Sequence, residues 1–151
     1  LILNELDILG YNVFYEILNA THYGLPQIRN RLFIVGIRKD LGNKFEFPKK
    51  WDRLIYTLDE VMGGKVSREF AFTIRIGGRR SGINNRFNWD SYNVDGKVRY
   101  ITPDECKLLQ GFPKDFILTG NQNKQYKQVG NSVPVTIVKS IGEELIKVKA
   151  I

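Results

Sequence analysis

The stretch Tyr23-Gly-Leu-Pro-Gln-Ile-Arg-Asn-Arg31, followed directly by Leu32-Phe-Ile-Val-Gly-Ile37, decides the fold class. Its first part contains Gly24 and Pro26 and is typical of a tight turn. Its second part is almost continuously apolar, and the run Tyr11–Leu18 is similarly rich in β-branched and aromatic residues. Such runs are typical of strands that are buried on both faces inside an α/β sheet. We therefore predict an α/β protein in which other layers cover both faces of these strands.

Three polar residues alternate along the turn: Gln27, Arg29 and Arg31. In extended geometry their side chains leave the same face of the chain. Two guanidinium groups and a carboxamide at the mouth of a sheet can bind an anion, a phosphate or the carbonyl edge of a base. The alternative is structural, with both arginines in ion pairs with carboxylates.

Two helices are predicted in the C-terminal third. Thr102-Pro-Asp-Glu105 has the residues of a capping box with proline at the first helical position, and Gly111 is placed to end this helix. A second helix is predicted from about Asn131 to about Lys149, with an apolar stripe that needs a partner surface. Because Cys106 falls on the apolar side of the first helix, we predict a buried structural thiol rather than a nucleophile.

The segment Gln128-Val-Gly-Asn-Ser-Val-Pro134 is predicted to open the second helix. A glycine followed by two small polar residues at a helix start presents unpaired backbone N–H groups, which suit an anionic or polar cofactor group. Plain helix capping is the alternative. For Gln110-Gly-Phe-Pro-Lys-Asp-Phe116, core packing of the two phenylalanines is the preferred explanation.

The composition of the 151 residues excludes several classes of protein. One cysteine and one histidine cannot form an intrachain disulfide framework or a typical zinc site, so no metal is predicted. No apolar stretch approaches the ~20 residues that cross a bilayer, which predicts a cytoplasmic protein without a membrane partner. Leu1–Leu9 has helical apolar spacing closed by Gly10, and a chain that opens inside such a segment without Met is predicted to be a fragment.

The positive charge is concentrated between Lys65 and Tyr100, where eight basic residues stand against three acidic ones and give +5 of the chain's +7. Arginines mixed with aromatic residues and glycines suit contact with phosphates and bases. A solvated basic face over a small β core is the alternative.

Taken in order, three segments resemble motifs of the DNA cytosine-C5 methyltransferases. The turn Gln27-Ile-Arg-Asn-Arg31 resembles the eighth motif, Arg99-Tyr-Ile-Thr-Pro-Asp-Glu-Cys-Lys-Leu-Leu-Gln-Gly-Phe-Pro113 the ninth, and Tyr126-Lys-Gln-Val-Gly-Asn-Ser-Val-Pro134 the tenth. Between them, Phe72-Thr-Ile-Arg-Ile-Gly-Gly78 resembles the threonine-leucine element of that family's target recognition domain. His22 is a departure, since relatives often carry Asp there. The family's glycine-rich cofactor motif, Pro-Cys catalytic loop and Glu-Asn-Val motif precede this region and do not occur in the chain.

The resemblance implies the C-terminal part of a Rossmann-like methyltransferase fold, with strands and the closing helix of the large domain, plus a small, mostly β target recognition domain. Residues 1–40 and 119–151 would belong to the catalytic domain. Residues 41–118 would form the recognition domain with its linker.

The resemblance also implies a reaction. A cytosine is flipped out of the duplex, a cysteine thiolate attacks carbon 6, and carbon 5 takes the methyl group of S-adenosyl-L-methionine. The thiolate would come from an N-terminal half, in the same chain or in a separate subunit, so this chain alone would be inactive.

The resemblance assigns site residues as well. Arg31 would orient the flipped cytosine, with Arg29 and Gln27 holding the loop. The cofactor would contact Asn131, Ser132 and Val133. Double-stranded DNA would contact Arg75, Gly77, Gly78, Arg79, Arg80 and Arg86. Two alternatives remain: a stand-alone DNA-binding module without catalysis, and the tRNA-methylating branch of the same fold.

Overall fold

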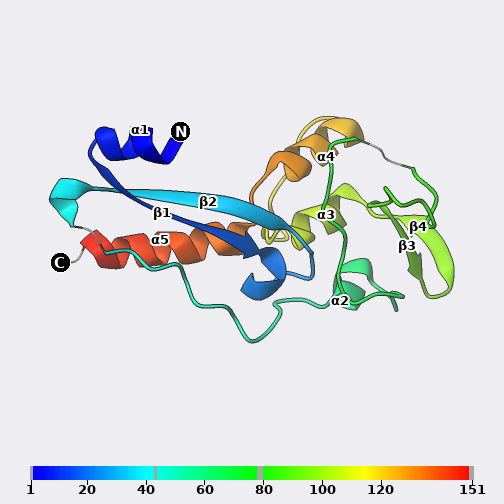
Figure 1. Cartoon of the computed structure of the whole chain (residues 1–151). Coiled ribbons are helices and arrows are strands. Elements are labelled where there is room, and N and C mark those ends of the chain that lie inside the picture. Colours follow the sequence, from blue (N-terminus) through cyan, green and yellow to red (C-terminus); the bar gives the residue numbers. More distant parts are fainter. Residues whose placement is uncertain (1, 43, 78–79, 150–151) are drawn as a thin grey trace.

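An antiparallel ribbon of two long strands forms one end of the molecule. In this computed structural model, which describes residues 2–42, 44–77 and 80–149, β1 (Tyr11–Asn19) pairs with β2 (Asn30–Arg38) along its whole length. The long helix α5 (Val135–Lys149) runs along the ribbon, and the short helix α1 (Ile2–Ile8) precedes β1 (Figure 1). The α/β character is therefore confirmed, with the two strands as neighbours.

The first hydrophobic core lies between the ribbon and α5. One face of the ribbon contributes Leu18, Val35 and Ile37, which pack with Ile137 and Ile141 of the helix. This face of the ribbon covers the apolar stripe of α5 and so provides the partner surface that the sequence pattern of the helix requires.

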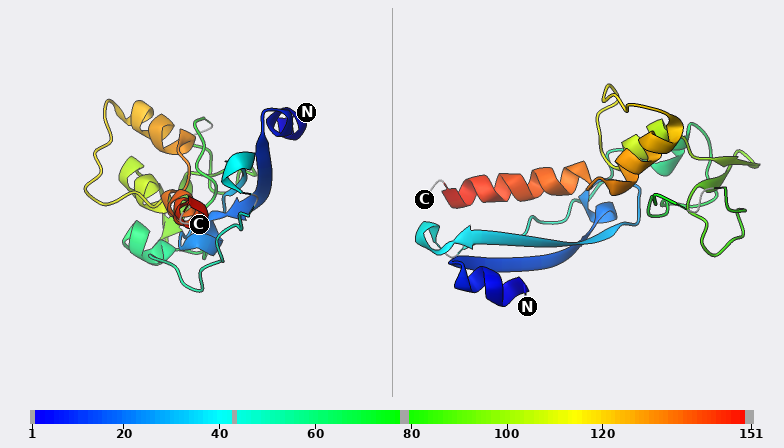
Figure 2. Two further views of the ribbon diagram at one scale, coloured as in Figure 1. Left: turned by 90° about the vertical axis from the view of Figure 1, so that its left-hand side faces the viewer. Right: turned by 90° about the horizontal axis from the view of Figure 1, so that it is seen from above.

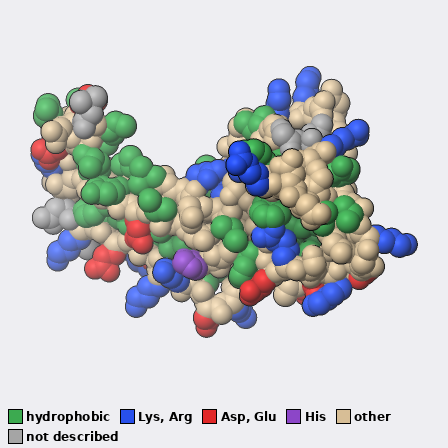
Figure 3. All heavy atoms as spheres, turned by 45° about the vertical axis from the view of Figure 1, so that its right-hand side comes forward, with side chains coloured by type: hydrophobic (Ala, Val, Ile, Leu, Met, Phe, Trp, Pro, Cys, Tyr) green, Lys and Arg blue, Asp and Glu red, His purple; other side chains and the backbone are tan. Residues whose placement is uncertain are grey.

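The opposite face of the ribbon is open, so the prediction of strands covered on both faces is wrong for the described residues. Tyr15 and Ile17 are 60% and 68% exposed, and Leu32 and Ile34 are also exposed. Side chains alternate across a strand, and within the described chain only α5 is long enough to cover one side. Figure 3 shows hydrophobic side chains beside a broad hollow in the surface.

The second body is built from short elements. These are α2 (Leu58–Met62), β3 (Ser91–Val94), β4 (Lys97–Tyr100), α3 (Pro103–Leu109) and α4 (Gln122–Asn131). Figure 2 shows them gathered at the end of the molecule away from the free end of the ribbon. Their shared core includes Trp89, Tyr92, Ile101, Leu109 and Tyr126. Helix α4 therefore packs with elements of the predicted segment 41–118, although its own residues belong to the predicted segment 119–151.

The expected mostly β character of residues 41–118 is wrong for the part that the structure describes. Only the hairpin β3–β4 is strand, with four residues on each side, and its Asp95-Gly96 turn has positive φ at both residues. Helices α2 and α3 and irregular chain make up the rest. Side chains cap the turns: Asn88 accepts hydrogen bonds from the backbone N–H groups of Asp90 and Ser91.

Three helix predictions are confirmed, and one is corrected. Gly10 and Gly111 have positive φ where helix ends were expected, and Thr102 and Glu105 form the capping box of α3. The last helix, however, begins at Val135 rather than near Asn131. The residue before a proline is disfavoured in helical geometry, so Pro134 separates α4 from α5. Helix α4 itself was not predicted, because its sequence is polar and only Tyr126 and Val129 are buried.

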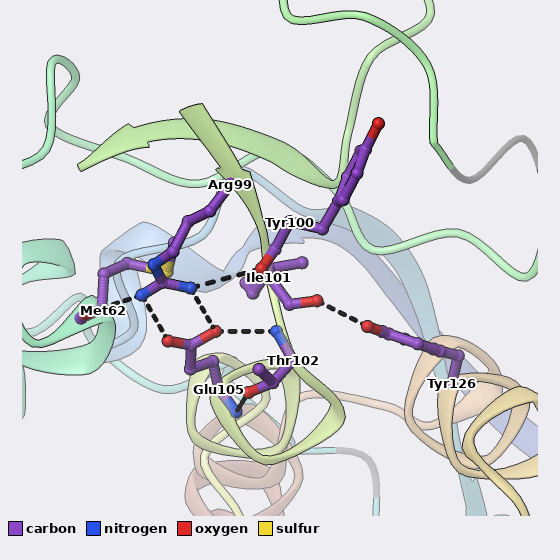
Figure 4. Close-up of polar contacts among 7 residues, drawn as sticks. All are labelled: Met62, Arg99, Tyr100, Ile101, Thr102, Glu105 and Tyr126. Carbon is purple, nitrogen blue, oxygen red and sulfur yellow. Dashed lines mark hydrogen bonds and ion pairs between the residues drawn. The ribbon is translucent and has the colours of Figure 1, made fainter. Parts of the chain in front are cut away.

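A polar network joins β4 to three helices (Figure 4). Arg99 makes two hydrogen bonds to the Glu105 carboxylate, at 3.0 and 2.6 Å, and also donates to the carbonyl of Met62 at the end of α2. The hydroxyl of Tyr126 donates to the carbonyl of Ile101. One arginine–carboxylate pair thus fastens the hairpin, α2 and the start of α3 together.

Substituting Glu105 by alanine is expected to lower the free energy of unfolding by about 2–3 kcal/mol, because the helix cap and the bidentate partner of Arg99 are lost together. A urea titration of the protein followed by far-UV circular dichroism measures this loss. The control is Glu143→Ala on α5, whose side chain is 58% exposed and lies 4.0 Å from the exposed Lys139. It is expected to change stability by no more than about 0.5 kcal/mol. Equal losses in the two variants would contradict the structural role of the network.

No helix in the described part of the chain is both long and apolar enough to cross a membrane.

Candidate functional site

The turn before β2 is fixed by buried side chains. It follows a short 3-10 helix, Ala20–Tyr23, that ends at Gly24 with φ +82. Gly24 lies so close to the Trp51 ring that a Cβ would stand 2.7 Å from its Cε3 atom, so only glycine fits here without a shift. Gln27, which is 0% exposed, donates to the carbonyl of Leu109 (2.9 Å) and accepts from the N–H of Ile74 (3.3 Å).

Arg29 is the second buried side chain of the turn, at 2% exposed. It donates to three carbonyl oxygens: Ile74 at 3.1 Å, Gly130 at 3.0 Å and Ser132 at 2.9 Å. Burial lowers the pKa of Arg29 to about 10, with a smaller contribution from the charge of Arg31, and the group remains a cation at neutral pH. Within the described residues neither arginine forms an ion pair with a carboxylate, so that alternative is wrong for them.

Arg31 differs from its two neighbours in the motif. It is the second residue of β2, it is exposed, and its guanidinium donates to the adjacent carbonyl of Asn30 at 2.7 Å. The structure therefore places Gln27 and Arg29 in one buried network and leaves Arg31 at the surface, where a ligand can reach it.

The turn also forms hydrogen bonds to residues 71–74, which precede the arginine-rich segment that begins at Arg75. Backbone hydrogen bonds join Ile28 N–H to Ala71 (3.0 Å) and Ala71 N–H to Pro26 (2.8 Å), and the Thr73 hydroxyl donates to Ile28 at 2.6 Å. With both backbone groups of Ile74 bonded to Gln27 and Arg29, the position of the next residue, Arg75, is set by the turn. Segments far apart in the sequence thus share one polar core.

The loop between α4 and α5 lies against the same segment. A Cβ on Gly130, in the last turn of α4, would come within 3.3 Å of the backbone carbon and oxygen of Arg75, so a larger residue here would push the two segments apart by a few tenths of an ångström. Asn131 and Val133 are exposed on either side of the partly buried Ser132. The structure therefore brings the predicted cofactor residues next to the start of the predicted DNA-binding residues.

The expectation of a helix start at Asn131 is wrong, because α5 begins four residues later, at Val135. Asn131 is the last residue of α4, and the N–H of Val135 donates to the backbone carbonyl of Gln110 at 2.9 Å. A helix C-terminus presents carbonyl oxygens, which attract donors and cations rather than anions. The donors here are Arg29 and the side chain of Gln110.

Gln110 is a site residue that the sequence did not reveal. The preferred explanation for its segment, core packing of Phe112 and Phe116, is wrong: the two rings lie 4.6 Å apart between centroids, but Phe116 is 43% exposed and neither ring belongs to the hydrophobic cores of the described residues. Gln110 itself is 0% exposed and bonds to the loop described above. The available signal was a glutamine on the buried side of a capped helix, immediately before its terminal glycine. The prediction that Cys106 is a buried thiol is confirmed, and burial raises its pKa.

Four of the six predicted DNA-binding residues are exposed, on a segment whose backbone is held by two buried side chains. Arg75, Gly77, Arg80 and Arg86 are exposed, whereas Gly78 and Arg79 lie outside the described residues. Trp89 donates its indole N–H to the carbonyl of Gly77 at 2.9 Å, and the buried Asp90 accepts from the N–H of Arg80 at 2.7 Å. Figure 3 shows Lys and Arg side chains over this end of the molecule, beside the hollow. Such a surface suits the phosphate groups of a nucleic acid.

Comparison with known proteins agrees with this arrangement. Residues 1–76 and 64–147 match the model of the C-5 cytosine-specific DNA methylase family. Type II methyltransferase M.MthTI of Methanothermobacter thermautotrophicus is 32% identical, over 97% of this chain and 59% of its own. M.BsuFI of Bacillus subtilis is 32% identical, over 93% of this chain and 41% of its own. The chain thus spans about half the length of these relatives.

Solved structures show the same fold. A methyltransferase of Entamoeba histolytica, EhMeth, has a TM-score of 0.71 at 17% identity, covering 97% of this chain and 57% of its own. The Dnmt2 methyltransferase of S. pombe has a TM-score of 0.62 at 15% identity, covering 95% of this chain and 60% of its own. With its family model matched over nearly the whole length, the chain belongs to the C-5 cytosine-specific DNA methylase family.

Proposed function

We propose that this chain is the C-terminal portion of a DNA (cytosine-5-)-methyltransferase of a type II restriction-modification system, acting on duplex DNA in the cytoplasm. Residues 41–118 supply target recognition, and residues 1–40 and 119–151 complete the catalytic domain. The observation that carries the proposal is the shared polar core, in which Gln27 and Arg29 join the recognition segment at Ile74 to the loop at Gly130 and Ser132.

The exposed Arg31 is assigned to the target cytosine. A guanidinium has several N–H donors and suits the cytosine carbonyl, on which negative charge develops when a nucleophile attacks the ring. Arg29 and Gln27 are positioning residues, since their hydrogen bonds go to the protein itself. Cys106 is too buried to be the nucleophile, so the thiolate comes from the N-terminal half of the enzyme.

The loop residues fit S-adenosyl-L-methionine, which supplies the methyl group when bound. Asn131 offers an exposed carboxamide and Val133 an exposed apolar surface, whereas the carbonyls of Val129, Gly130 and Ser132 are already bonded to Gln110 and Arg29. The carboxamide can both donate and accept hydrogen bonds and so suits the polar groups of the cofactor, and the valine suits its apolar parts. Together, Asn131, Ser132 and Val133 form one side of the proposed cofactor pocket.

Assay of the enzyme with its cysteine-bearing half tests the proposal. With tritiated S-adenosylmethionine, we expect label on carbon 5 of cytosine in unmethylated duplex DNA, and none when this chain is supplied alone. Duplex DNA and tRNA are compared in the same assay. Label in tRNA only would support the tRNA-methylating alternative, and no label in any nucleic acid would overturn both readings.

A stand-alone DNA-binding module is the second candidate. The open ribbon face with Tyr15, Ile17 and Leu32 argues against it, because exposed apolar patches of this kind mark contact surfaces. A monodisperse chain that binds DNA without binding an apolar dye would favour the module.

A further inference from the structure

The side chain of Gln110 forms hydrogen bonds to the end of α4 and to the loop that follows it. Its amide nitrogen lies 3.0 Å from the carbonyl oxygen of Val129, 3.2 Å from that of Ser132 and 3.1 Å from the Ser132 hydroxyl. Its amide oxygen accepts from Gln27 at 3.3 Å. All polar atoms of this fully buried carboxamide therefore have partners.

The partners fix the orientation of this carboxamide. Carbonyl oxygens only accept hydrogen bonds, so the group that faces Val129 and Ser132 must be the NH₂. The oxygen then faces the NH₂ of Gln27, whose own oxygen faces the N–H of Ile74. A side chain of similar length without the NH₂ leaves the two loop carbonyls without this donor.

Gln110 holds the loop at both ends. The side chain bonds to the end of α4, and the backbone carbonyl accepts from Val135, the first residue of α5. Arg29 bonds to the carbonyl of Gly130 in the last turn of α4 and to that of Ser132 in the loop. Asn131 and Val133, between these anchors, remain exposed and free to contact a ligand.

From this geometry we infer that Gln110 is a positioning residue for S-adenosylmethionine, acting through residues Gly130–Val133 at the end of α4 and in the loop that follows. The inference rests on the proposed function of that loop. Gln110 does not touch the cofactor: it sets the backbone path that presents Asn131 and Val133. A misplacement of such a loop by a fraction of an ångström weakens the contacts that its exposed side chains make.

The test is Gln110→Met in the complete methyltransferase. We expect the KM for S-adenosylmethionine and the Kd for S-adenosylhomocysteine to rise about tenfold. The Kd for duplex DNA should stay within about twofold. Because the defect lies in cofactor binding, saturating S-adenosylmethionine should restore kcat to within about threefold of the unsubstituted enzyme.

Leu109→Ala is the matched control for a merely structural effect. Leu109 is the neighbouring residue, is also 0% exposed and belongs to the second core, and its side chain forms no part of the polar network. It should lower the melting temperature at least as much as Gln110→Met, with both cofactor constants within about twofold of normal.

Gln110→Asn is the second variant, and it tests the positioning role of Gln110 if Gln110→Met does not fold. It keeps the amide but is one methylene too short to reach the loop, so the same rise in KM is expected. Cofactor constants that stay normal in the Gln110 variants, or that rise equally in Leu109→Ala, would overturn the inference alone. An unsubstituted enzyme that does not bind S-adenosylmethionine would overturn the proposed function, and the inference with it.

Discussion

Replacing Arg31 with alanine is expected to lower kcat for methyl transfer by about 10²–10³-fold, the cost of removing one donor aimed at developing charge. The side chain is exposed at the start of β2, so its loss should leave the fold intact. The KM for DNA should change far less than kcat, because the contact to the flipped base strengthens as charge develops. Single-turnover methylation of a duplex substrate measures the chemical step directly.

Two further variants make the Arg31 experiment specific. Arg38→Ala removes an exposed arginine at the other end of the same strand, where it pairs with Asp40, and should leave kcat unchanged. Arg31→Lys keeps the charge but loses the planar donor pair, and should recover only part of the activity. Full activity in Arg31→Ala would remove this residue from the cytosine site.

Replacing Arg29 with methionine is expected to lower the free energy of unfolding by about 3–5 kcal/mol, because the carbonyl oxygens of Ile74 and Gly130 lose this donor and that of Ser132 keeps only Gln110. The loss also separates the segment at Ile74 from the loop at Gly130, so DNA and cofactor binding should both weaken. Urea unfolding, together with equilibrium binding of S-adenosylhomocysteine and of duplex DNA, measures these effects.

Arg31→Met provides the matched control for Arg29→Met. The two arginines are two residues apart, but one is 2% exposed and the other lies at the surface. Arg31→Met should therefore unfold within about 0.5 kcal/mol of the unsubstituted protein. Arg29→Lys, which keeps the charge but cannot span all three carbonyls, should lose about half as much stability as Arg29→Met. Similar stabilities for Arg29→Met and Arg31→Met would contradict the buried network.

Several local features could be predicted from the sequence because short-range chemistry decides them. The capping box of Thr102 and Glu105 depends on residues three positions apart, and Gly10 and Gly111 end helices because glycine accepts positive φ. The apolar strands were likewise found from composition. The polar helix α4 gave no such signal, since its position depends on burying Tyr126 and Val129 in a core formed with distant residues.

In the candidate site, too, some features could be predicted from the sequence and others depend on the tertiary structure. The sequence by itself determined which segments carry the family's motifs, and that the single cysteine lies on the apolar side of a helix. Only the tertiary structure decided that Arg29 is buried while Arg31 is exposed, and that Gln110 holds the loop after α4. The physical reason is that a buried polar side chain is defined by its partners, and here these come from residues up to 103 positions away along the chain.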